Sequence, residues 1–297
     1  MRAIFQWNIG ARFLELGRRT LIMGVVNVTP DSFSDGGLHI DAASAVVYAE
    51  QLLDQGASII DVGGESTRPG AAVADSASGS GVTEDQERER ILPVIRDLKK
   101  RRPQAVISVD TYKASVARAA VELGAEVVND ISGFRWDPTM KKTLAELKVG
   151  AVLMHTRGRP EEWKKLPPIG DAVLLVKREL RQWAEAATLA GIKRDHLVLD
   201  PGFGFGKRFE ENFPLLAHFA ELQQMGFPLL AGVSRKSFIG RALAQDGKDA
   251  AVEERMYGTL AAEAALILKG AHIIRTHDVR HMVEAARVVD AVVASGG

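Results

Sequence analysis

Short apolar runs recur along the chain and alternate with segments of helical spacing. Several of the runs are rich in Val and Ile and almost continuously hydrophobic, which is typical of strands that are covered on both faces. The runs predict eight strands, at residues 21–26, 58–62, 105–109, 126–128, 151–154, 197–199, 228–231 and 273–274.

Between these runs, apolar residues recur at the spacing of an amphipathic helix. The predicted helices are residues 42–54, 84–100, 113–123, 138–147, 171–190, 213–224, 252–269 and 279–293. Strands that alternate with helices indicate a parallel α/β fold, and eight repeats favour a closed TIM (β/α)8 barrel over an open sheet. Two short alternating stretches within residues 1–20 predict an N-terminal β-hairpin that caps the bottom of the barrel.

Length and composition narrow the class of protein. The 297 residues suit one barrel of about 250 residues with an extension, so we expect a single domain over residues 1–297, although two ordinary domains would also fit. Lys plus Arg and Asp plus Glu both number 38, so the net charge is zero and no nucleic-acid partner is expected. The absence of cysteine excludes disulfides and thiolate metal sites and fits a cytoplasmic protein. The chain has neither a signal-peptide pattern nor a run of about 18 apolar residues, so no membrane partner is expected.

Two segments interrupt the alternation of strands and helices. Residues 63–83 follow the second predicted strand, and the part from residue 70 onward is rich in Ala, Ser and Gly. This composition predicts a long mobile surface loop. Residues 245–248 are predicted to form a second, shorter loop.

Polar or glycine-rich clusters follow nearly every predicted strand. In a TIM barrel the residues at the carboxyl ends of the strands carry the chemistry, so these clusters predict one shared site. In strand order they are Asn27; Thr67, Arg68 and Pro69; Asp110; Asn129; His155; Asp200 to Lys207; Ser234 to Ser237; and Arg275 to Asp278.

Taken singly, these clusters have plainer explanations. Asp110 or Asn129 could be a helix N-cap, and Asp200 could belong to a turn. Arg275 and His277 could be solvated charges. A single polar cluster after a strand could arise by coincidence, but clusters at the same end of eight strands are far less likely to do so. Their common position favours the functional interpretation.

The glycine-rich segment 202–206 matches neither the Rossmann nor the P-loop pattern, because the glycine spacing before Lys207 is wrong. Its glycines would let the backbone approach a flat ligand, with Phe203 or Phe205 providing a ring for the ligand to pack on. Both rings could instead belong to the core. His155 is as consistent with a structural role as with a functional one.

The motifs closely resemble the signatures of the dihydropteroate synthases, in the same order along the chain. The matching segments are Met23 to Gly37, Asp61 to Gly70, Ser108 to Thr111, Val128 to Gly133, Asp200 to Lys207, Ser234 to Ser237 and Arg275 to Asp278. The resemblance implies a pterin-binding TIM barrel and a folate-pathway transferase. Such enzymes join 4-aminobenzoate to the methylene carbon of a dihydropterin diphosphate, releasing pyrophosphate and forming dihydropteroate. Sulfonamides resemble 4-aminobenzoate and are expected to bind.

The resemblance also implies which residues surround the pterin, a flat ring with adjacent donors and acceptors. A carboxylate can accept two N–H donors and an ammonium can serve ring acceptors, which suits Asp200 and Lys236. Asn129 offers both a donor and an acceptor, and Asp110 completes the set. Pro69, Phe205, Ser234 and Lys236 are expected to form the 4-aminobenzoate pocket.

The leaving diphosphate needs positive charge and donors that strengthen as negative charge develops. Thr67, Arg68, Arg275 and His277 suit this task. Mg2+ prefers oxygen ligands and accepts them from phosphate and water, so Asn27 is expected to supply one ligand. The expected catalytic residues are Asp110, Arg68, Lys236, Arg275 and His277.

Departure of pyrophosphate leaves a cation that the ring delocalises, so an SN1-like path is expected, with Asp110 stabilising the cation and without a catalytic triad. Two loops, residues 31–37 and 67–70, are expected to close over the site. Residues 73–81 make the second loop longer than is usual in the family. Family members are commonly homodimers, which we expect here. Two alternatives remain: a pterin-binding methyltransferase, which has no use for a diphosphate clamp, and an inactive pterin-binding paralogue.

Overall fold

A computed structural model describes residues 2–29, 42–66 and 81–296 of the chain. Eight parallel strands form the centre of the fold, in the spatial order β8-β7-β6-β5-β4-β3-β10-β9. A bridge between Leu199 and Leu229 brings the two outer strands of this order together, so the sheet closes into a barrel. The predicted TIM barrel is therefore confirmed. The strands are β3 (Leu21–Asn27), β4 (Ile59–Gly63), β5 (Val106–Asp110), β6 (Val127–Asp130), β7 (Gly150–Met154), β8 (Leu197–Asp200), β9 (Leu230–Ala231) and β10 (Ile273–Thr276).

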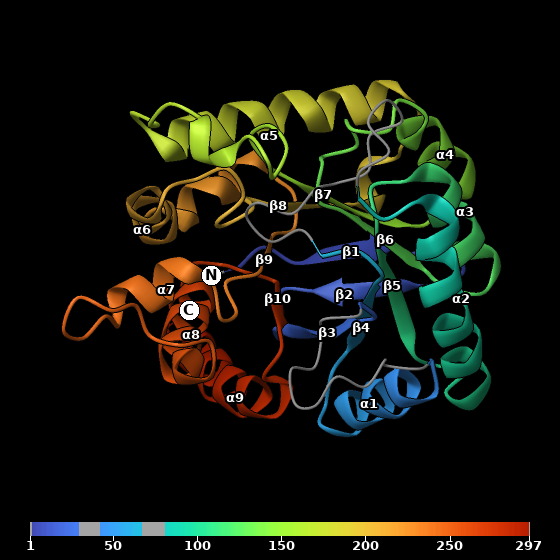
Figure 1. Cartoon of the computed structure of the whole chain (residues 1–297), viewed down its shortest axis with the longest axis horizontal. Helices are drawn as coiled ribbons and strands as arrows, with labels where there is room; N and C mark the ends of the chain where they lie inside the picture. The colour runs from blue at the N-terminus through green and yellow to red at the C-terminus, as the bar shows by residue number, and fades with distance from the viewer. Residues whose placement is uncertain (1, 30–41, 67–80, 297) are drawn as a thin grey trace.

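Helices surround the barrel (Figure 1). They are α1 (Ala42–Asp54), α2 (Glu84–Arg101), α3 (Ala114–Glu122), α4 (Met140–Leu147), α5 (Ala172–Leu189), α6 (Phe209–Ala217), α7 (Ser237–Ala242), α8 (Met256–Leu268) and α9 (Val279–Ser295). Among the helices in the described residues, none is long and apolar enough to cross a membrane.

The prediction of one helix over residues 213–224 was wrong. Helix α6 begins earlier, at Phe209, because the Glu211 side chain accepts a hydrogen bond from the Arg208 backbone N–H at 2.6 Å and closes the first turn. The chain leaves helical geometry at His218 and continues as a 3-10 helix, Phe219–Met225. The six-residue helix α7 was not predicted, since it is too short to carry a periodic pattern.

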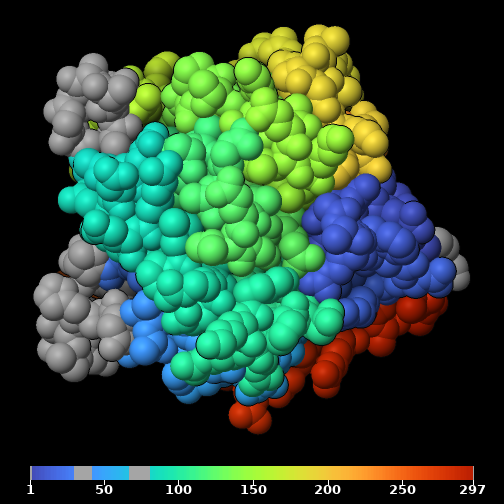
Figure 2. Space-filling view, turned by 90° about the vertical axis from the view of Figure 1, so that its right-hand side faces the viewer, coloured from blue at the N-terminus to red at the C-terminus, as the bar shows by residue number. Residues whose placement is uncertain are grey.

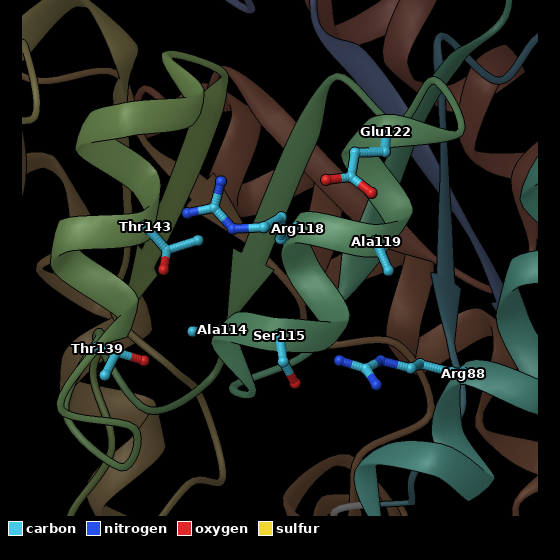
Figure 3. A pocket seen from close by; sticks show the side chains of 8 residues that line it. All are labelled: Arg88, Ala114, Ser115, Arg118, Ala119, Glu122, Thr139 and Thr143. Carbon is cyan, nitrogen blue, oxygen red and sulfur yellow. The ribbon is translucent and has the colours of Figure 1, made fainter.

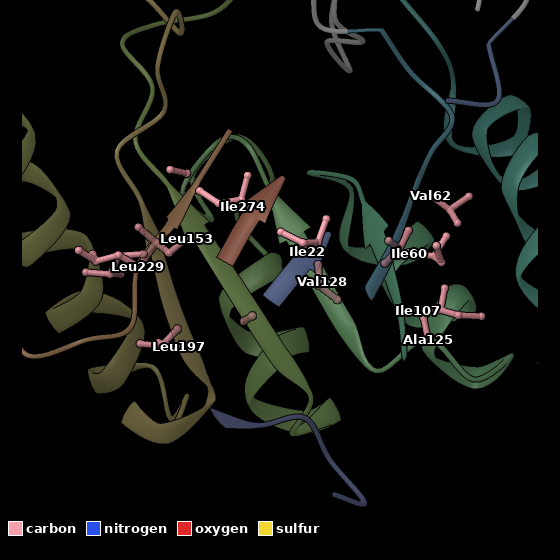
Figure 4. Close-up of a cluster of buried hydrophobic side chains, with 14 of the residues drawn as sticks. Ile22, Ile60, Val62, Ile107, Ala125, Val128, Leu153, Leu197, Leu229 and Ile274 are labelled. Carbon is pink, nitrogen blue, oxygen red and sulfur yellow. The ribbon is translucent and has the colours of Figure 1, made fainter. Parts of the chain in front are cut away.

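Alternate residues along each strand serve two different apolar layers. Ile22, Ile60, Val128 and Ile274 face outward and pack in the layer beneath the helices (Figure 4). Met23, Ile59, Val106 and Val127 belong to a second cluster, which also contains Trp7, Ile9 and Leu16 of the N-terminal segment. Side chains that point to opposite faces at successive positions explain why the strands are hydrophobic almost throughout.

The predicted N-terminal hairpin is confirmed, with β1 (Phe5–Asn8) antiparallel to β2 (Phe13–Leu16). Its Trp7 is fully buried and donates from Nε1 to the His196 carbonyl at 2.8 Å. A Cβ at Gly150, the first residue of β7, would lie 2.7 Å from Ile9 and 2.9 Å from the Trp7 ring. The hairpin therefore fills the amino-terminal end of the barrel, where it lies beside the red C-terminal helix (Figure 2).

Candidate functional site

The carboxyl ends of neighbouring strands bring predicted site residues into one row. Asn27 of β3 is in register with Gly63 of β4, Gly63 with Asp110 of β5, and Asp110 with Asn129 of β6. Residues in register on parallel strands point to the same side of a sheet. Because Asp110 and Asn129 contact groups inside the barrel, the whole row faces inward.

Arg275 lies at the centre of this inner face. Its Nε is 2.6 Å from Oδ2 of Asp61, and its Nη2 is 2.7 Å from Oδ2 of Asp110. Asn129 donates to the same Asp61 oxygen at 3.0 Å. Burial alone would lower the pKa of Arg275, but the adjacent Asp61 and Asp110 raise it above its ordinary value. The guanidinium therefore stays charged, and it links strands β4, β5 and β10.

Asp61 was not predicted as a site residue. Its side chain is fully buried, and its second oxygen, Oδ1, has no hydrogen-bond partner among the described residues. The available signal was an acidic residue inside the apolar run of β4, because a buried carboxylate needs a cation or donors nearby. That cation, Arg275, is 214 residues further along the chain.

Asp200 and Lys236 form a second polar group on the rim. Asp200 Oδ1 accepts the Gly202 backbone N–H at 2.7 Å, and Lys236 donates to the Phe203 carbonyl. Burial raises the pKa of Asp200, although Lys236 opposes the rise. Burial lowers the pKa of Lys236 to about 7, with Asp200 opposing the fall. Burial therefore disfavours the charged form of both groups, a perturbation that is common at functional sites.

The glycine-rich segment after β8 follows a path that larger residues could not take. Gly202 has φ +64°, and a Cβ there would lie 1.9 Å from the His155 carbonyl oxygen. The two neighbouring phenylalanines have different surroundings. Phe203 is fully buried in the layer beneath the helices, so its ring belongs to the core. Phe205 packs against a small apolar cluster that includes Met154, and the Lys236 ammonium is 4.4 Å from its ring centroid. Only Phe205 lies beside the polar site.

Lys207 and His155 make a buried support behind this segment, which sequence reasoning did not anticipate. Lys207 Nζ donates to the Gly202 carbonyl at 2.7 Å and lies 2.9 Å from His155 Nδ1. His155 Nε2 is 3.1 Å from Glu179, and the imidazole stacks on Trp183 at 5.1 Å. Burial lowers the pKa of His155 to about 3, so the ring is neutral and accepts from Lys207. The structural interpretation of His155 fits these contacts.

His277 and Ser234 occupy the ends of β10 and the segment after β9. Ser234 Oγ accepts the His277 backbone N–H at 3.1 Å and lies 2.9 Å from Nδ1 of its ring. Ser234 is buried, and its hydroxyl also lies 3.3 Å from Oγ1 of Thr276. His277 follows Arg275 by two residues, which brings two candidate phosphate ligands to the end of β10.

Three predicted residues, Thr67, Arg68 and Pro69, lie outside the described residues, as do both predicted closing loops and most of the long loop. Asn27 ends β3 and is partly exposed. Within residues 2–29, 42–66 and 81–296, no three His, Cys, Asp or Glu side chains gather as a metal site. A metal here would depend on an amide oxygen and on oxygens of the substrate.

A separate hollow of about 370 Å3 lies outside the barrel, between α2, α3 and α4 (Figure 3). Its polar walls are already occupied by internal pairs. Arg118 is 2.5 Å from Glu146, and Ser115 donates to Glu84 at 2.5 Å. The hollow contains none of the predicted rim residues, so the candidate site remains the barrel mouth.

Comparison with known proteins gives consistent matches. The family model for pterin binding enzymes matches residues 23–277. Dihydropteroate synthase from Escherichia coli is 42% identical over 274 residues, which cover 92% of each chain. The structure of Xanthomonas albilineans dihydropteroate synthase with 4-aminobenzoic acid has a TM-score of 0.86 at 40% identity and covers 98% of this chain and 99% of that one. The Yersinia pestis dihydropteroate synthase in a sulfonamide complex has a TM-score of 0.86 at 38% identity. The match covers 97% of this chain and 99% of that one.

Proposed function

The chain belongs to the dihydropteroate synthase family of pterin-binding enzymes, and we propose that its barrel rim carries out the reaction of that family. The enzyme joins 4-aminobenzoate to (7,8-dihydropterin-6-yl)methyl diphosphate, forming 7,8-dihydropteroate and diphosphate. The observation that carries the proposal is the rim itself. Acceptors and an ammonium suited to a pterin edge stand beside Arg275, a cation held at the centre of the barrel mouth.

Asp200, Lys236 and Asn129 are proposed to bind the pterin. The carboxylate of Asp200 accepts the adjacent N–H groups of the ring, and the Lys236 ammonium donates to its acceptors. Lys236 also lies over the Phe205 ring, which supplies a flat apolar surface next to the charge. Burial of these groups supports the assignment, because hydrogen bonds to charged groups strengthen where water is excluded.

Arg275 and His277, with Thr67 and Arg68, are proposed to hold the diphosphate. Two of the five N–H groups of Arg275 serve Asp61 and Asp110, and the diphosphate would use the others. Negative charge on the leaving group grows as its bond to carbon breaks, so a fixed cation stabilises the transition state more than the ground state.

Mg2+ fits Asn27, which presents an amide oxygen on the inner face in register with Gly63, a residue without a side chain. Asn27 would hold the ion together with substrate phosphate and water, and the ion would neutralise charge on the departing diphosphate. Removal of the ion by a chelator should reduce activity without unfolding the protein, because the described core contains no other candidate metal cluster.

Asp110 is proposed to stabilise the carbon that loses the diphosphate. In an SN1-like path the C–O bond breaks first, and the pterin ring delocalises the resulting cation. The amine of 4-aminobenzoate then forms the C–N bond and releases a proton to water or diphosphate. Pro69, Phe205, Ser234 and Lys236 are the proposed 4-aminobenzoate pocket. Binding of 4-aminobenzoate itself is supported by the Xanthomonas albilineans relative, whose structure contains 4-aminobenzoic acid.

The decisive experiment supplies the purified protein with Mg2+, the pterin diphosphate and 4-aminobenzoate, and measures pyrophosphate and dihydropteroate. We expect both products in equal amounts. A folded sample without turnover would contradict the proposal. Binding of methyltetrahydrofolate without pyrophosphate release would favour the methyltransferase, and pterin binding without either reaction would favour the inactive paralogue. Lys236→Ala and Asp200→Ala should weaken pterin binding while the circular-dichroism spectrum stays unchanged.

A homodimer is also proposed. The last two helices expose Leu268 at 56%, Val288 at 67% and Val292 at 55%. Val288 and Val292 are one helical turn apart on α9, and neighbouring exposed apolar side chains are typical of contact surfaces. Light scattering should give a mass near twice 32.2 kDa. A monomer at micromolar concentration would contradict this part of the proposal. The cytoplasmic location stays a prediction.

A further inference from the structure

Arg235 has a backbone conformation that is unusual for its residue type. The Lys236 N–H donates to the Val233 carbonyl at 3.1 Å and closes a tight turn over residues 233–236. Arg235 is the third residue of this turn and has φ +56°. A positive φ at that position is ordinarily supplied by Gly or Asn, because a β-carbon is unfavourable there. An arginine in this place therefore needs a compensating interaction.

Asp278, at the start of α9, is equally unusual. It occupies the N-cap of the helix, where an aspartate ordinarily accepts a backbone N–H of the first turn. Over the described start of α9, the Asp278 side chain makes no such capping hydrogen bond. Its oxygens instead accept from the Arg235 guanidinium, Nε to Oδ2 at 3.0 Å and Nη2 to Oδ1 at 2.5 Å. One ion pair therefore accounts for both departures from local preference.

This ion pair differs from an ordinary surface pair. The Asp278 side chain is only 8% exposed, although that of Arg235 is 36% exposed. The contact is also bidentate, which fixes the relative orientation of the two groups as well as their distance. A single contact between two flexible exposed side chains would not do so.

The backbone of Arg235 is held as firmly as its side chain. Its N–H donates to Oγ1 of Thr259, a fully buried residue of α8, at 3.0 Å. Its carbonyl accepts from Nη1 of Arg255 at 3.0 Å. Arg235 thus connects the turn to α8 and α9, which are neighbouring helices (Figure 1). A strained residue that its surroundings hold in this way is typical of functional sites.

The pair lies between two groups of residues that are proposed to bind substrates. Ser234 and Lys236 flank Arg235 in the turn, and Arg275 and His277 shortly precede Asp278. We propose that Arg235 and Asp278 are positioning residues, which hold the 4-aminobenzoate pocket at a fixed place relative to the diphosphate ligands. The roles of the flanking residues come from the proposed function, on which this inference rests.

The reaction explains why this placement matters. The amine of 4-aminobenzoate must reach the methylene carbon from which the diphosphate departs. A misplacement of about 1 Å between reacting groups can slow a reaction about 100-fold. Arg235 and Asp278 therefore affect the rate without contacting either substrate.

Two single variants break the pair in different ways. Arg235→Gly removes the guanidinium but tolerates the positive φ, and Asp278→Asn removes the charge but keeps the shape of the side chain. Each should lower the single-turnover rate of dihydropteroate formation about 10- to 100-fold with both substrates saturating. Each should remain folded, as urea unfolding would show. A rise in KM with an unchanged rate at saturation would overturn the proposal.

The double variant Arg235→Gly/Asp278→Asn distinguishes positioning from direct contact with substrate. If the residues act only through their pair, the double variant should lose no more rate than either single variant. Additive losses would overturn the proposal. A slow Arg235→Gly variant beside a fully active Asp278→Asn variant would also overturn it, because Arg235 would then act without its partner.

Lys148 provides a matched control. It also has a positive φ, +53°, but it lies at the end of α4, two residues before β7 begins. Lys148→Gly should raise the urea midpoint slightly by relieving the same kind of strain, and it should leave the single-turnover rate unchanged. An equal loss of rate in Lys148→Gly would overturn the proposal, since the effect would not be specific to the turn at residues 233–236.

Hydrogen-exchange mass spectrometry of the substrate-free protein tests the positioning without any turnover. The Lys236 amide closes the turn, so the peptide that contains it should exchange faster in Asp278→Asn than in the unaltered protein. Equal exchange would overturn the proposal. Faster exchange in Asp278→Asn, together with an unaltered protein that makes no dihydropteroate, would instead contradict the proposed function and leave the fixing of the turn by Asp278 standing.

Discussion

The two ends of the barrel are built from the same strands but differ in chemistry. In β4, Ile59 packs against the N-terminal hairpin, and two residues later Asp61 pairs with Arg275. In β8, Val198 belongs to the same lower cluster and Asp200 to the rim. The lower end therefore stabilises the fold by burying apolar surface, whereas the upper end holds charges that are costly to bury. On each of these strands the residue that stabilises the fold and the residue of the rim are two positions apart, a distance of roughly 7 Å.

Arg275→Met should give the largest effect, because this residue serves both stability and chemistry at the upper end. Asp61 and Asp110 would lose their cation, and breaking a buried ion pair costs about 3–5 kcal/mol of unfolding free energy. Loss of the diphosphate ligand should also lower kcat about a hundred- to thousandfold. Urea unfolding and steady-state kinetics measure the two losses separately. Adding Asp61→Asn should restore stability in part without restoring activity; a double variant as unstable as the single one would contradict the pairing.

Trp7→Ala tests the lower end. The side chain is fully buried in the hairpin and bonds to the His196 carbonyl, so its removal should cost about 3–5 kcal/mol of unfolding free energy. Activity of the folded fraction should not change, since the hairpin is at the opposite end from the rim. Trp7→Phe, which keeps an aromatic ring, should cost less. A lowered kcat in folded Trp7→Ala would show that the two ends are coupled.

The sequence alone predicts the two ends to different degrees. The strands and the hairpin follow from apolar patterns that are local, and Asp110, Asn129, Asp200 and Arg275 stand out because they directly follow apolar runs. Asp61 does not stand out in the same way, since it lies inside a run and its partner is distant. The sequence does not tell which face of the strand points into the barrel, or that Arg275 contacts Asp61 on that face.

The supporting groups are harder still to predict. Lys207 looks like the end of a glycine-rich motif until its contact with His155, 52 residues earlier, is known. Helix α7 is too short for periodicity, and β9 has only two residues. In each case the role depends on long-range packing that no local pattern encodes.

A matched pair of substitutions on β8 would sharpen the contrast within one strand. Asp200→Asn removes a charge but keeps an acceptor for the Gly202 N–H, so pterin affinity should fall about 10- to 100-fold, with no loss of stability. Val198→Ala, two residues earlier in the apolar cluster, should cost about 1–3 kcal/mol of unfolding free energy and leave pterin affinity unchanged. Calorimetric titration and urea unfolding of both variants provide the comparison. Reversed effects would contradict the division between the two ends.

The pH dependence offers the finest test, because activity and stability should change in opposite directions. Burial lowers the pKa of Lys236 to about 7, so its ammonium is lost as pH rises through that value. The kcat/KM for the pterin diphosphate, which reports the free enzyme, should then fall with a midpoint near pH 7. An alkaline limb that persists unchanged in Lys236→Met would contradict the assignment.

Stability should rise over the same range. The unfolded chain keeps the lysine protonated to about pH 10.4, so between pH 7 and that value it binds more protons than the folded state. The unfolding free energy should therefore increase by up to about 1.4 kcal/mol per pH unit for each such lysine. Lys207, whose pKa burial also lowers to about 7, contributes equally. Lys207→Met should remove the contribution of Lys207 to the increase of unfolding free energy with pH, and the alkaline fall in kcat/KM should remain. Lys236→Met should remove the contribution of Lys236 to that increase and also abolish the alkaline fall in kcat/KM. Only a lysine that contacts the substrate affects the pH dependence of both stability and kcat/KM. The two variants therefore distinguish Lys236 at the rim from Lys207, which is buried behind it.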